Sequence, residues 1–279
     1  DEERLRRGVA ALEGRGYRVA LADNVRSRSG FLAGSDEERA AGYRDLLARP
    51  DVDAIVFARG GYGASRILRF LRADEIASRP RVHVGGSDLT ALFAFLAAHA
   101  RLVTFYGPMV AVSMADAEGL DWEAVLGGAL PEPHAFGPGD VLAGGYGEGP
   151  LLGGCLSLLA SLAGTPEAPD LSGAVLFWED VGEETYRLDR MLTQLERSGT
   201  LDGLQAMIIG SISPGARGGG ETPEAVGAWL EDRFAGAPYP VVRNFPAGHL
   251  ATTRTLPLGV PVRLDADRGR LEFSSPGTL

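Results

Sequence analysis

Cysteine, histidine and lysine are scarce in this chain of 279 residues, which has one cysteine, four histidines and no lysine. The single cysteine, Cys155, excludes an internal disulfide, and the cysteine and histidine clusters of a zinc site are absent. We therefore expect no metal site. One cysteine also fits a reducing, cytoplasmic compartment.

Long hydrophobic runs are absent as well. No stretch approaches the roughly 18 consecutive apolar residues that cross a bilayer. The first residues, Asp1-Glu2-Glu3-Arg4, are unlike a signal peptide. The chain begins inside a helical pattern, as it would if an upstream segment were missing. We expect no membrane partner.

Basic charge is outweighed by acidic charge, since 27 basic residues face 37 acidic ones and the net charge is −10. The basic residues are arginines, which indicates a composition bias and not a function. Nucleic-acid binding needs clustered positive charge, so this balance argues against a nucleic-acid partner. An apolar content of 45% allows a large core in one large or two modest domains.

Helical patterns alternate with short β-rich runs over residues 1–130. This order is typical of parallel strands joined by crossover helices, and it predicts a doubly wound α/β domain. The expected helices span residues 5–12, 36–48, 64–71 and 89–99, and the expected strands span 17–21, 54–57, 82–84 and 102–104.

The periodicity fails over residues 131–150, where glycine and proline accumulate, so we expect a linker there. Residues 151–279 then form a second, smaller α/β domain with a β-rich tail. Its expected helices are 156–163, 185–196 and 223–234, its strands 174–178, 206–209 and 239–243, and its final hairpin 260–264 with 270–273.

Ser87 follows an apolar strand and two glycines, Gly85 and Gly86, and a helical segment begins at once after it. A sharp turn from strand to helix lifts a serine off the sheet and directs helical N–H groups toward the group it attacks. Ser87 is therefore a candidate nucleophile. The alternative that Ser87 or Asp88 simply caps the helix stays open, because Leu89 stands where a hydrolase elbow has its second glycine.

The run Arg59-Gly60-Gly61-Tyr62-Gly63 follows the strand at 54–57. Successive glycines let backbone N–H groups face an anion or an oxyanion. A dinucleotide-binding fingerprint is disfavoured, because its final glycine is missing and the strand is not the first one.

A serine needs a base, and the base needs an orienting acid. The strand near Phe177 ends in two carboxylates, Glu179 and Asp180, and either can orient an imidazole, although Asp180 also has a structural interpretation. Glu183 and Glu184 suit the first turn of the following helix.

The four histidines differ in their expected positions. His83 lies inside a strand, His99 ends a helix and His134 falls in the linker. His249 follows Gly248 in a loop after a strand, which makes it the candidate general base by elimination. The alternative that this loop histidine is structural or simply exposed stays open.

Together these motifs resemble the LD-carboxypeptidase family of serine peptidases, which includes murein tetrapeptide carboxypeptidases and microcin C immunity peptidases. The resemblance covers most of the chain. It rests on Gly34-Ser35-Asp36, Ala58 to Gly63, Gly86 to Thr90, Gly107-Pro108-Met109, Leu152 to Leu159, Trp178 to Glu183, Gly248-His249 and Leu256 to Gly259.

The resemblance implies a Rossmann-like N-terminal domain that carries the serine, a C-terminal domain that carries the acid and the histidine, and a homodimer. It places a catalytic triad on Ser87, Glu179 and His249. It also places an oxyanion hole on the backbone of Asp88 and of the Gly60-Gly61 pair.

Three features depart from the family pattern. The usual first β-strand is absent, Gly86 replaces a common tyrosine, and Cys155 replaces a common asparagine. None of them removes a member of the triad, but the last two alter the expected pocket.

The implied reaction is hydrolysis of the amide between an L-centre and a terminal D-amino acid of a murein peptide, through an acyl-enzyme, in peptidoglycan recycling. It implies no cofactor. The small peptide substrate ends in a carboxylate, which an arginine fork can bind. Arg59, Arg66 and Arg254 are the candidates, and the sequence does not choose among them.

Two alternatives remain. A microcin-immunity-like peptidase acting on aminoacyl or peptidyl nucleotide analogues needs an aromatic platform, for which Trp122 and Trp178 are available. A noncatalytic, two-lobed protein that binds a small molecule has the same α/β layout.

Overall fold

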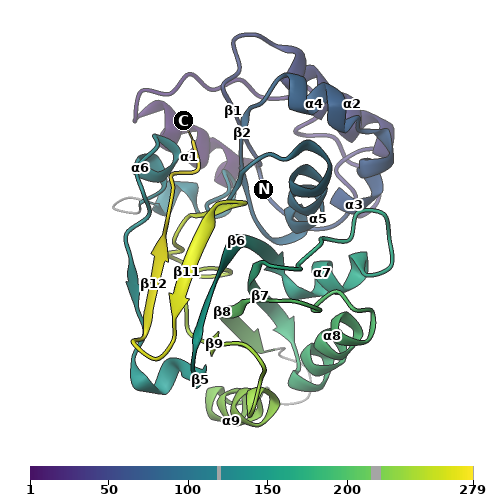
Figure 1. Ribbon diagram of the computed structural model, residues 1–279. Coiled ribbons are helices and arrows are strands. Elements are labelled where there is room, and N and C mark those ends of the chain that lie inside the picture. The colour runs from purple at the N-terminus through teal and green to yellow at the C-terminus, as the bar shows by residue number, and fades with distance from the viewer. Residues whose placement is uncertain (118–120, 215–220, 279) are drawn as a thin grey trace.

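Two β-sheets organise the computed structural model, which describes residues 1–117, 121–214 and 221–278. The first part of the chain, in purple and blue, forms the upper half of the molecule in Figure 1, and the green segments form the lower half. The overall class is α/β, as the sequence predicts.

The first sheet has the strand order β1-β2-β3-β10. Its first three strands run parallel, and β10, from near the end of the chain, pairs antiparallel with β3. The strands are β1 (Ala54–Val56), β2 (Val82–Gly85), β3 (Thr104–Tyr106) and β10 (Leu256–Leu258). The helices of this half are α1 (Glu2–Glu13), α2 (Asp36–Ala48), α3 (Ala64–Ile67), α4 (Ala73–Ser78), α5 (Thr90–Phe95) and α6 (Trp122–Leu126).

The second sheet has the order β4-β12-β11-β6-β7-β8-β9-β5, with β6 to β9 parallel. Figure 1 shows β11 and β12, in yellow, beside β6. The strands are β4 (His134–Ala135), β5 (Val141–Ala143), β6 (Tyr146–Cys155), β7 (Val175–Glu183), β8 (Ala206–Pro214), β9 (Val241–Val242), β11 (Pro261–Asp265) and β12 (Arg270–Phe273). The helices are α7 (Leu156–Leu162), α8 (Thr185–Arg197) and α9 (Pro223–Phe234).

Local sequence explains several of these elements. Ser35 and Glu38 form a reciprocal capping box at the start of α2. The buried residues of α8, Leu188, Leu192 and Leu195, recur at helical spacing and pack against the second sheet.

One apolar core extends across both halves. It includes Leu92 and Phe93 on α5 of the first half, Phe177 on β7, and Leu264 of the final hairpin. Because the halves share this core, residues on the ends of both sheets are held in fixed relation.

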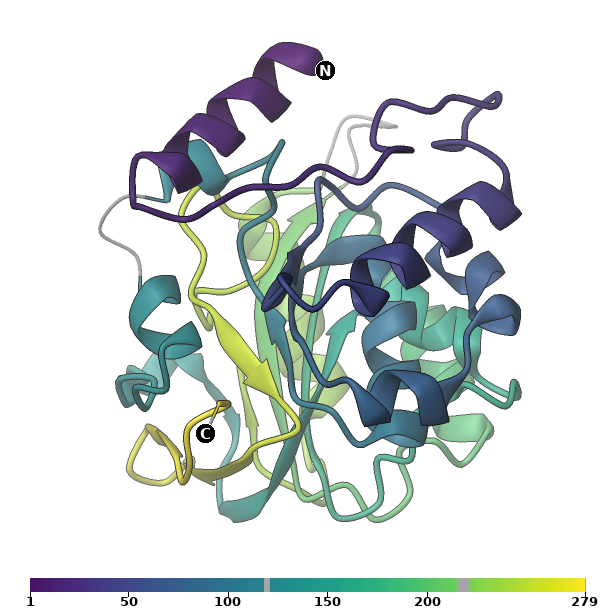
Figure 2. The ribbon, with the colours of Figure 1, turned by 90° about the horizontal axis from the view of Figure 1, so that it is seen from above.

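The strand expected at 17–21 is wrong. This segment crosses the top of the molecule as a loop after α1 (Figure 2). Tyr17 is 46% exposed, and its ring lies 5.9 Å from that of Trp122. Its ring therefore contacts α6, and the segment pairs with none of the strands in the described part of the chain.

Two further expectations differ from the structure. Residues 131–150, expected as a linker, contain β4, β5 and the start of β6, because the final hairpin and β9 offer edges to pair with. The strand expected at 102–104 lies at Thr104–Tyr106, because Arg101, with φ 53°, ends the preceding helical segment. Among the described helices, none has the length and apolar character to cross a membrane.

Candidate active site

Ser87 stands on the sharp turn between β2 and the helical segment that leads into α5. Its φ is 58°, in the left-handed region that non-glycine residues rarely occupy. Neither Ser87 nor Asp88 caps this helix through its side chain. A non-glycine residue held at positive φ after a strand is the geometry of a nucleophile elbow.

The glycine loop that follows β1 lies directly against Ser87. A Cβ on Gly60 would lie 2.8 Å from the Cβ of Ser87 and 3.2 Å from the backbone nitrogen of Asp88. The carboxylate of Asp88 accepts a hydrogen bond from the N–H of Ala64 at 2.8 Å, which ties the end of this loop to the elbow. Burial raises the pKa of the Asp88 carboxyl.

Glu179 and His249 are in direct contact. Nδ1 of His249 lies 2.7 Å from Oε2 of Glu179, and the backbone N–H of His249 donates to the same oxygen at 3.1 Å. Because a carboxylate only accepts, Nδ1 carries the proton and Nε2 is the basic nitrogen. The hydrogen bond to the fully buried Glu179 raises the pKa of His249 above its ordinary value.

Asp180, the other carboxylate at the end of this strand, has a different role. Its carboxylate accepts hydrogen bonds from the backbone N–H of Ser157 at 2.7 Å, in the first turn of α7, and from that of Val181 at 2.8 Å. Successive side chains of a strand point to opposite faces, so only Glu179 faces the histidine.

The other three histidines lie apart from this acid. His83 is fully buried and bonds to the hydroxyl of Tyr43 at 2.8 Å. His99 contacts the carbonyl of Pro166, and His134 packs edge-on against Phe136.

Tyr106, at the end of β3, connects the two groups and was not indicated by the sequence patterns. Its hydroxyl accepts a hydrogen bond from the backbone N–H of Ser87 at 2.8 Å and donates one to Oε1 of Glu179 at 2.6 Å. Three hydrogen bonds thus link the backbone of Ser87 to the ring of His249. The signal that could have found Tyr106 is its place at the carboxyl end of a parallel strand, where sites in such sheets lie.

The three candidate arginines have different surroundings. Arg66 forms an ion pair with the buried carboxylate of Asp36, with 2.9 Å between Nη2 and Oδ2. Arg254 donates to the carbonyl of Glu132 and lies 3.5 Å from a carboxylate oxygen of Asp121.

Arg59 is exposed and lies against Gly61 at the edge of the glycine loop. It forms no ion pair with any residue in the described ranges. A carboxylate ligand would therefore not have to displace an acidic partner from it.

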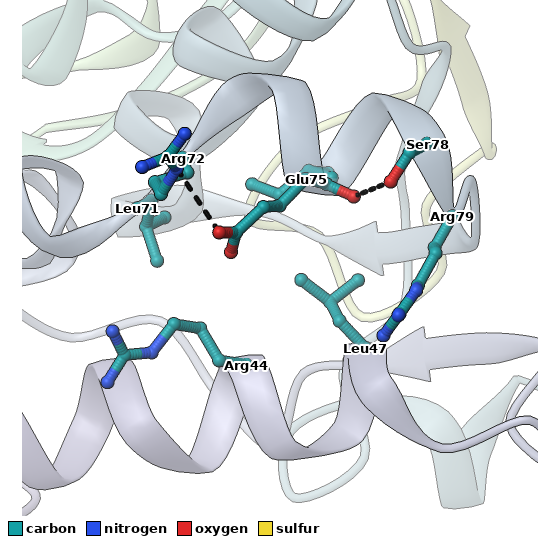
Figure 3. A pocket seen from close by; sticks show the side chains of 8 residues that line it. Arg44, Leu47, Leu71, Arg72, Glu75, Ser78 and Arg79 are labelled. Carbon is teal, nitrogen blue, oxygen red and sulfur yellow. Dashed lines mark hydrogen bonds and ion pairs between the residues drawn. The ribbon is translucent and has the colours of Figure 1, made fainter.

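The described residues contain no group of three or more His, Cys, Asp or Glu side chains arranged to hold a metal ion. A hollow of about 340 Å³ lies between α2 and α4, bordered by Arg44, Arg72 and Arg79 (Figure 3). Arg72 is paired there with Glu75. Ser87, Glu179 and His249 do not line this hollow, so it is separate from the candidate active site.

Two family models match the chain. One describes the LD-carboxypeptidase N-terminal domain and matches residues 1–107, and the other describes the LD-carboxypeptidase C-terminal domain and matches residues 148–264. The chain belongs to the LD-carboxypeptidase family, as the motifs predict.

Named relatives agree with this assignment. A putative carboxypeptidase of Streptomyces coelicolor is 41% identical, over 99% of this chain and 90% of that protein. The crystal structure of a muramoyltetrapeptide carboxypeptidase from Oxalobacter formigenes is similar with a TM-score of 0.83 and 32% identity, covering 98% of this chain and 94% of that one. The microcin C7 self-immunity protein bound to aspartyl sulfamoyl adenosine gives a TM-score of 0.83 at 25% identity, covering 98% and 90% of the two chains.

Proposed function

We propose that this protein is a serine LD-carboxypeptidase that removes the terminal D-amino acid of a murein peptide, with Ser87, His249 and Glu179 as its triad. The observation that carries the proposal is the hydrogen-bonded connection from the Ser87 backbone through Tyr106 and Glu179 to His249. It supports a shared site for a nucleophile, a base and an orienting acid that are far apart in sequence. Family membership supports the reaction type.

The reaction begins when His249 Nε2 takes the hydroxyl proton of Ser87 as Oγ attacks the carbonyl carbon of the scissile amide. Glu179 keeps the imidazole in the required tautomer and stabilises its cation. The C–N bond then breaks, and His249 returns the proton to the leaving amino group of the D-amino acid. Water, activated by the same base, hydrolyses the acyl-enzyme and regenerates Ser87.

The tetrahedral intermediate carries an oxyanion that needs N–H donors. We assign these donors to the backbone of Asp88 and of the Gly60-Gly61 pair. The close approach of Gly60 to both the Ser87 side chain and the Asp88 nitrogen supports this assignment. Each such donor typically contributes about 3 kcal/mol to transition-state stabilisation.

An exopeptidase also binds the free carboxylate of its substrate. We assign this contact to Arg59, because Arg66 and Arg254 are already paired with Asp36 and Asp121. Arg59 directly precedes Gly60, which lies against Ser87, and its guanidinium group can bind a carboxylate through two hydrogen bonds.

The burial of two tryptophans favours murein peptides over nucleotide analogues. Trp122 is 2% exposed and Trp178 is 0% exposed. Neither offers a ring face on which a nucleobase could stack. The apolar core shared by the two halves also gives no support to the hinge that a two-lobed binding protein uses.

The decisive experiment compares two substrates on the same preparation. A murein tetrapeptide and an aminoacyl sulfamoyl adenylate are each incubated with the wild-type protein and with Ser87→Ala, and products are measured by mass spectrometry. We expect release of the D-amino acid by the wild type alone and labelling of Ser87 by a fluorophosphonate. Cleavage of the adenylate only would assign the microcin-type activity, and reversible binding without labelling would assign a noncatalytic module.

We also propose that the protein acts as a homodimer in the cytoplasm, in peptidoglycan recycling. The single cysteine supports a reducing compartment. Sedimentation equilibrium tests the dimer, and cell fractionation tests the location.

A further inference from the structure

Tyr106 is buried between the two sheets, with 3% of its surface exposed. Its hydroxyl both accepts and donates a hydrogen bond. It accepts from the backbone N–H of Ser87 and donates to Glu179. Glu179 belongs to β7 of the second sheet, whereas Ser87 stands on the turn that follows β2 of the first sheet. This one oxygen therefore joins the elbow to the acid across the two halves.

The position of the Tyr106 ring is fixed from two sides. A Cβ on Gly86 would lie 3.3 Å from its Cζ, so the ring packs directly on the backbone that precedes Ser87. On another side it meets Phe177 edge-on, with 5.6 Å between ring centroids. A ring held this way gives its hydroxyl little freedom to move away from either partner.

Both partners depend on this hydroxyl. Within the described ranges it is the hydrogen-bond partner of the Ser87 N–H and of Oε1 of Glu179, whereas Oε2 is bound by His249. Removal of the hydroxyl therefore leaves a partly buried donor and a buried carboxylate oxygen without this partner.

We infer that Tyr106 is a positioning residue of the reaction: its hydroxyl holds the Ser87 elbow at positive φ and stabilises the charge on the carboxylate that orients His249. This inference rests on the proposed function, since it deepens the account of the same site. Tyr106 acts through Ser87 and Glu179, because its hydroxyl is bonded to both of them.

The sign of its effect on His249 follows from the hydrogen bonds. Without the donor from Tyr106, more negative charge stays on the oxygen of Glu179 that faces His249. The protonated imidazole is then stabilised further, so a higher pH is needed to produce the neutral base. The other titratable groups that interact with Glu179 are Asp180 and Cys155. Removal of the Tyr106 hydroxyl changes neither side chain.

The test is Tyr106→Phe, with Tyr43→Phe as the matched control. Tyr43 is also a buried tyrosine of the first half with a hydroxyl that bonds to a side chain, His83. We expect Tyr106→Phe to lower kcat on a murein tetrapeptide by about 10- to 100-fold with little change in KM. The acidic limb of its pH profile should move to higher pH, and the control should keep both values.

If Tyr106→Phe does not fold, 3-fluorotyrosine is placed at position 106 by codon suppression. This residue keeps the hydroxyl but donates more strongly, so the acidic limb should move to lower pH. The inference is overturned if the wild type is active but the acidic limb of the Tyr106 variant stays in place or moves in the opposite direction. An inactive wild type would instead contradict the proposed function, so the two failures are distinguishable.

Discussion

Gly248 and Glu179 approach so closely that a Cβ on the glycine would lie 2.7 Å from Oε2 of the carboxylate. The φ of Gly248 is +119°, which only glycine adopts readily. Because this residue has no side chain, the backbone of His249 can bond to the buried acid as well as the ring. The acid thus holds both the loop and the imidazole that the loop carries.

The first prediction concerns Glu179→Gln. The amide has the shape of the carboxylate, but its NH₂ group can face Nδ1 and favour the wrong imidazole tautomer. In a triad such a change lowers kcat by about 10⁴-fold. Steady-state kinetics with a murein tetrapeptide measure it, and Asp180→Asn is the neighbouring control, with a much smaller expected loss. Equal losses for the two variants would contradict the role of Glu179.

The second prediction concerns pH. The proposed reaction needs neutral His249, and the hydrogen bond to Glu179 raises the pKa of this histidine. The base is therefore protonated up to a higher pH than an ordinary histidine. The acidic limb of kcat/KM should have its midpoint above about 6.5, the ordinary histidine value. A midpoint below that value would show that another group limits the rate.

The sequence indicated the strand-to-helix turn at Ser87 and the loop at His249 because local signals, two glycines and a strand end, mark them. It left Glu179 and Asp180 undecided until the family motifs were considered, because the choice depends on which face of β7 meets the histidine loop.

The other features were not predicted because they depend on contacts between residues that are far apart in the sequence. No local signal in Leu256–Leu258 indicates that this strand joins β3, which is formed some 150 residues earlier. Tyr106 was overlooked for a related reason. The expected strand ended at residue 104, and the contact of Tyr106 with Glu179 spans 73 positions.

The third prediction uses the glycine loop. Gly60→Ala places a Cβ 3.0 Å from Oγ of Ser87, so either the loop or the hydroxyl must shift. A displacement of about 1 Å at a reacting centre can cost about 10²-fold in rate. Gly139→Ala is the control, because a Cβ there meets nothing within 4 Å. If Gly60→Ala retained full kcat with an unchanged fold, the loop would not border the reacting atoms.

The fourth prediction concerns His83, which is buried. Burial lowers the pKa of this histidine to about 4. The unfolded chain binds this proton near pH 6.5 and the folded chain does not, so stability falls as pH drops from about 6.5 toward 4. The loss amounts to about 3 kcal/mol. Urea unfolding at several pH values should show a shallower loss for His83→Gln. Parallel curves for the variant and the wild type would exclude His83 as the source.

The last prediction separates binding of the carboxylate from chemistry. Arg59→Met removes the guanidinium and keeps an unbranched side chain, so a peptide with a free terminal carboxylate should lose about 10- to 100-fold in kcat/KM. The kcat/KM for the slow cleavage of the same peptide with an amidated C-terminus should not change, because the amidated end carries no charge for Arg59 to bind. Arg44→Met is the matched control, since Arg44 is also exposed but borders the separate hollow between α2 and α4. Equal losses on both peptides would mean that Arg59 supports the loop and not the substrate.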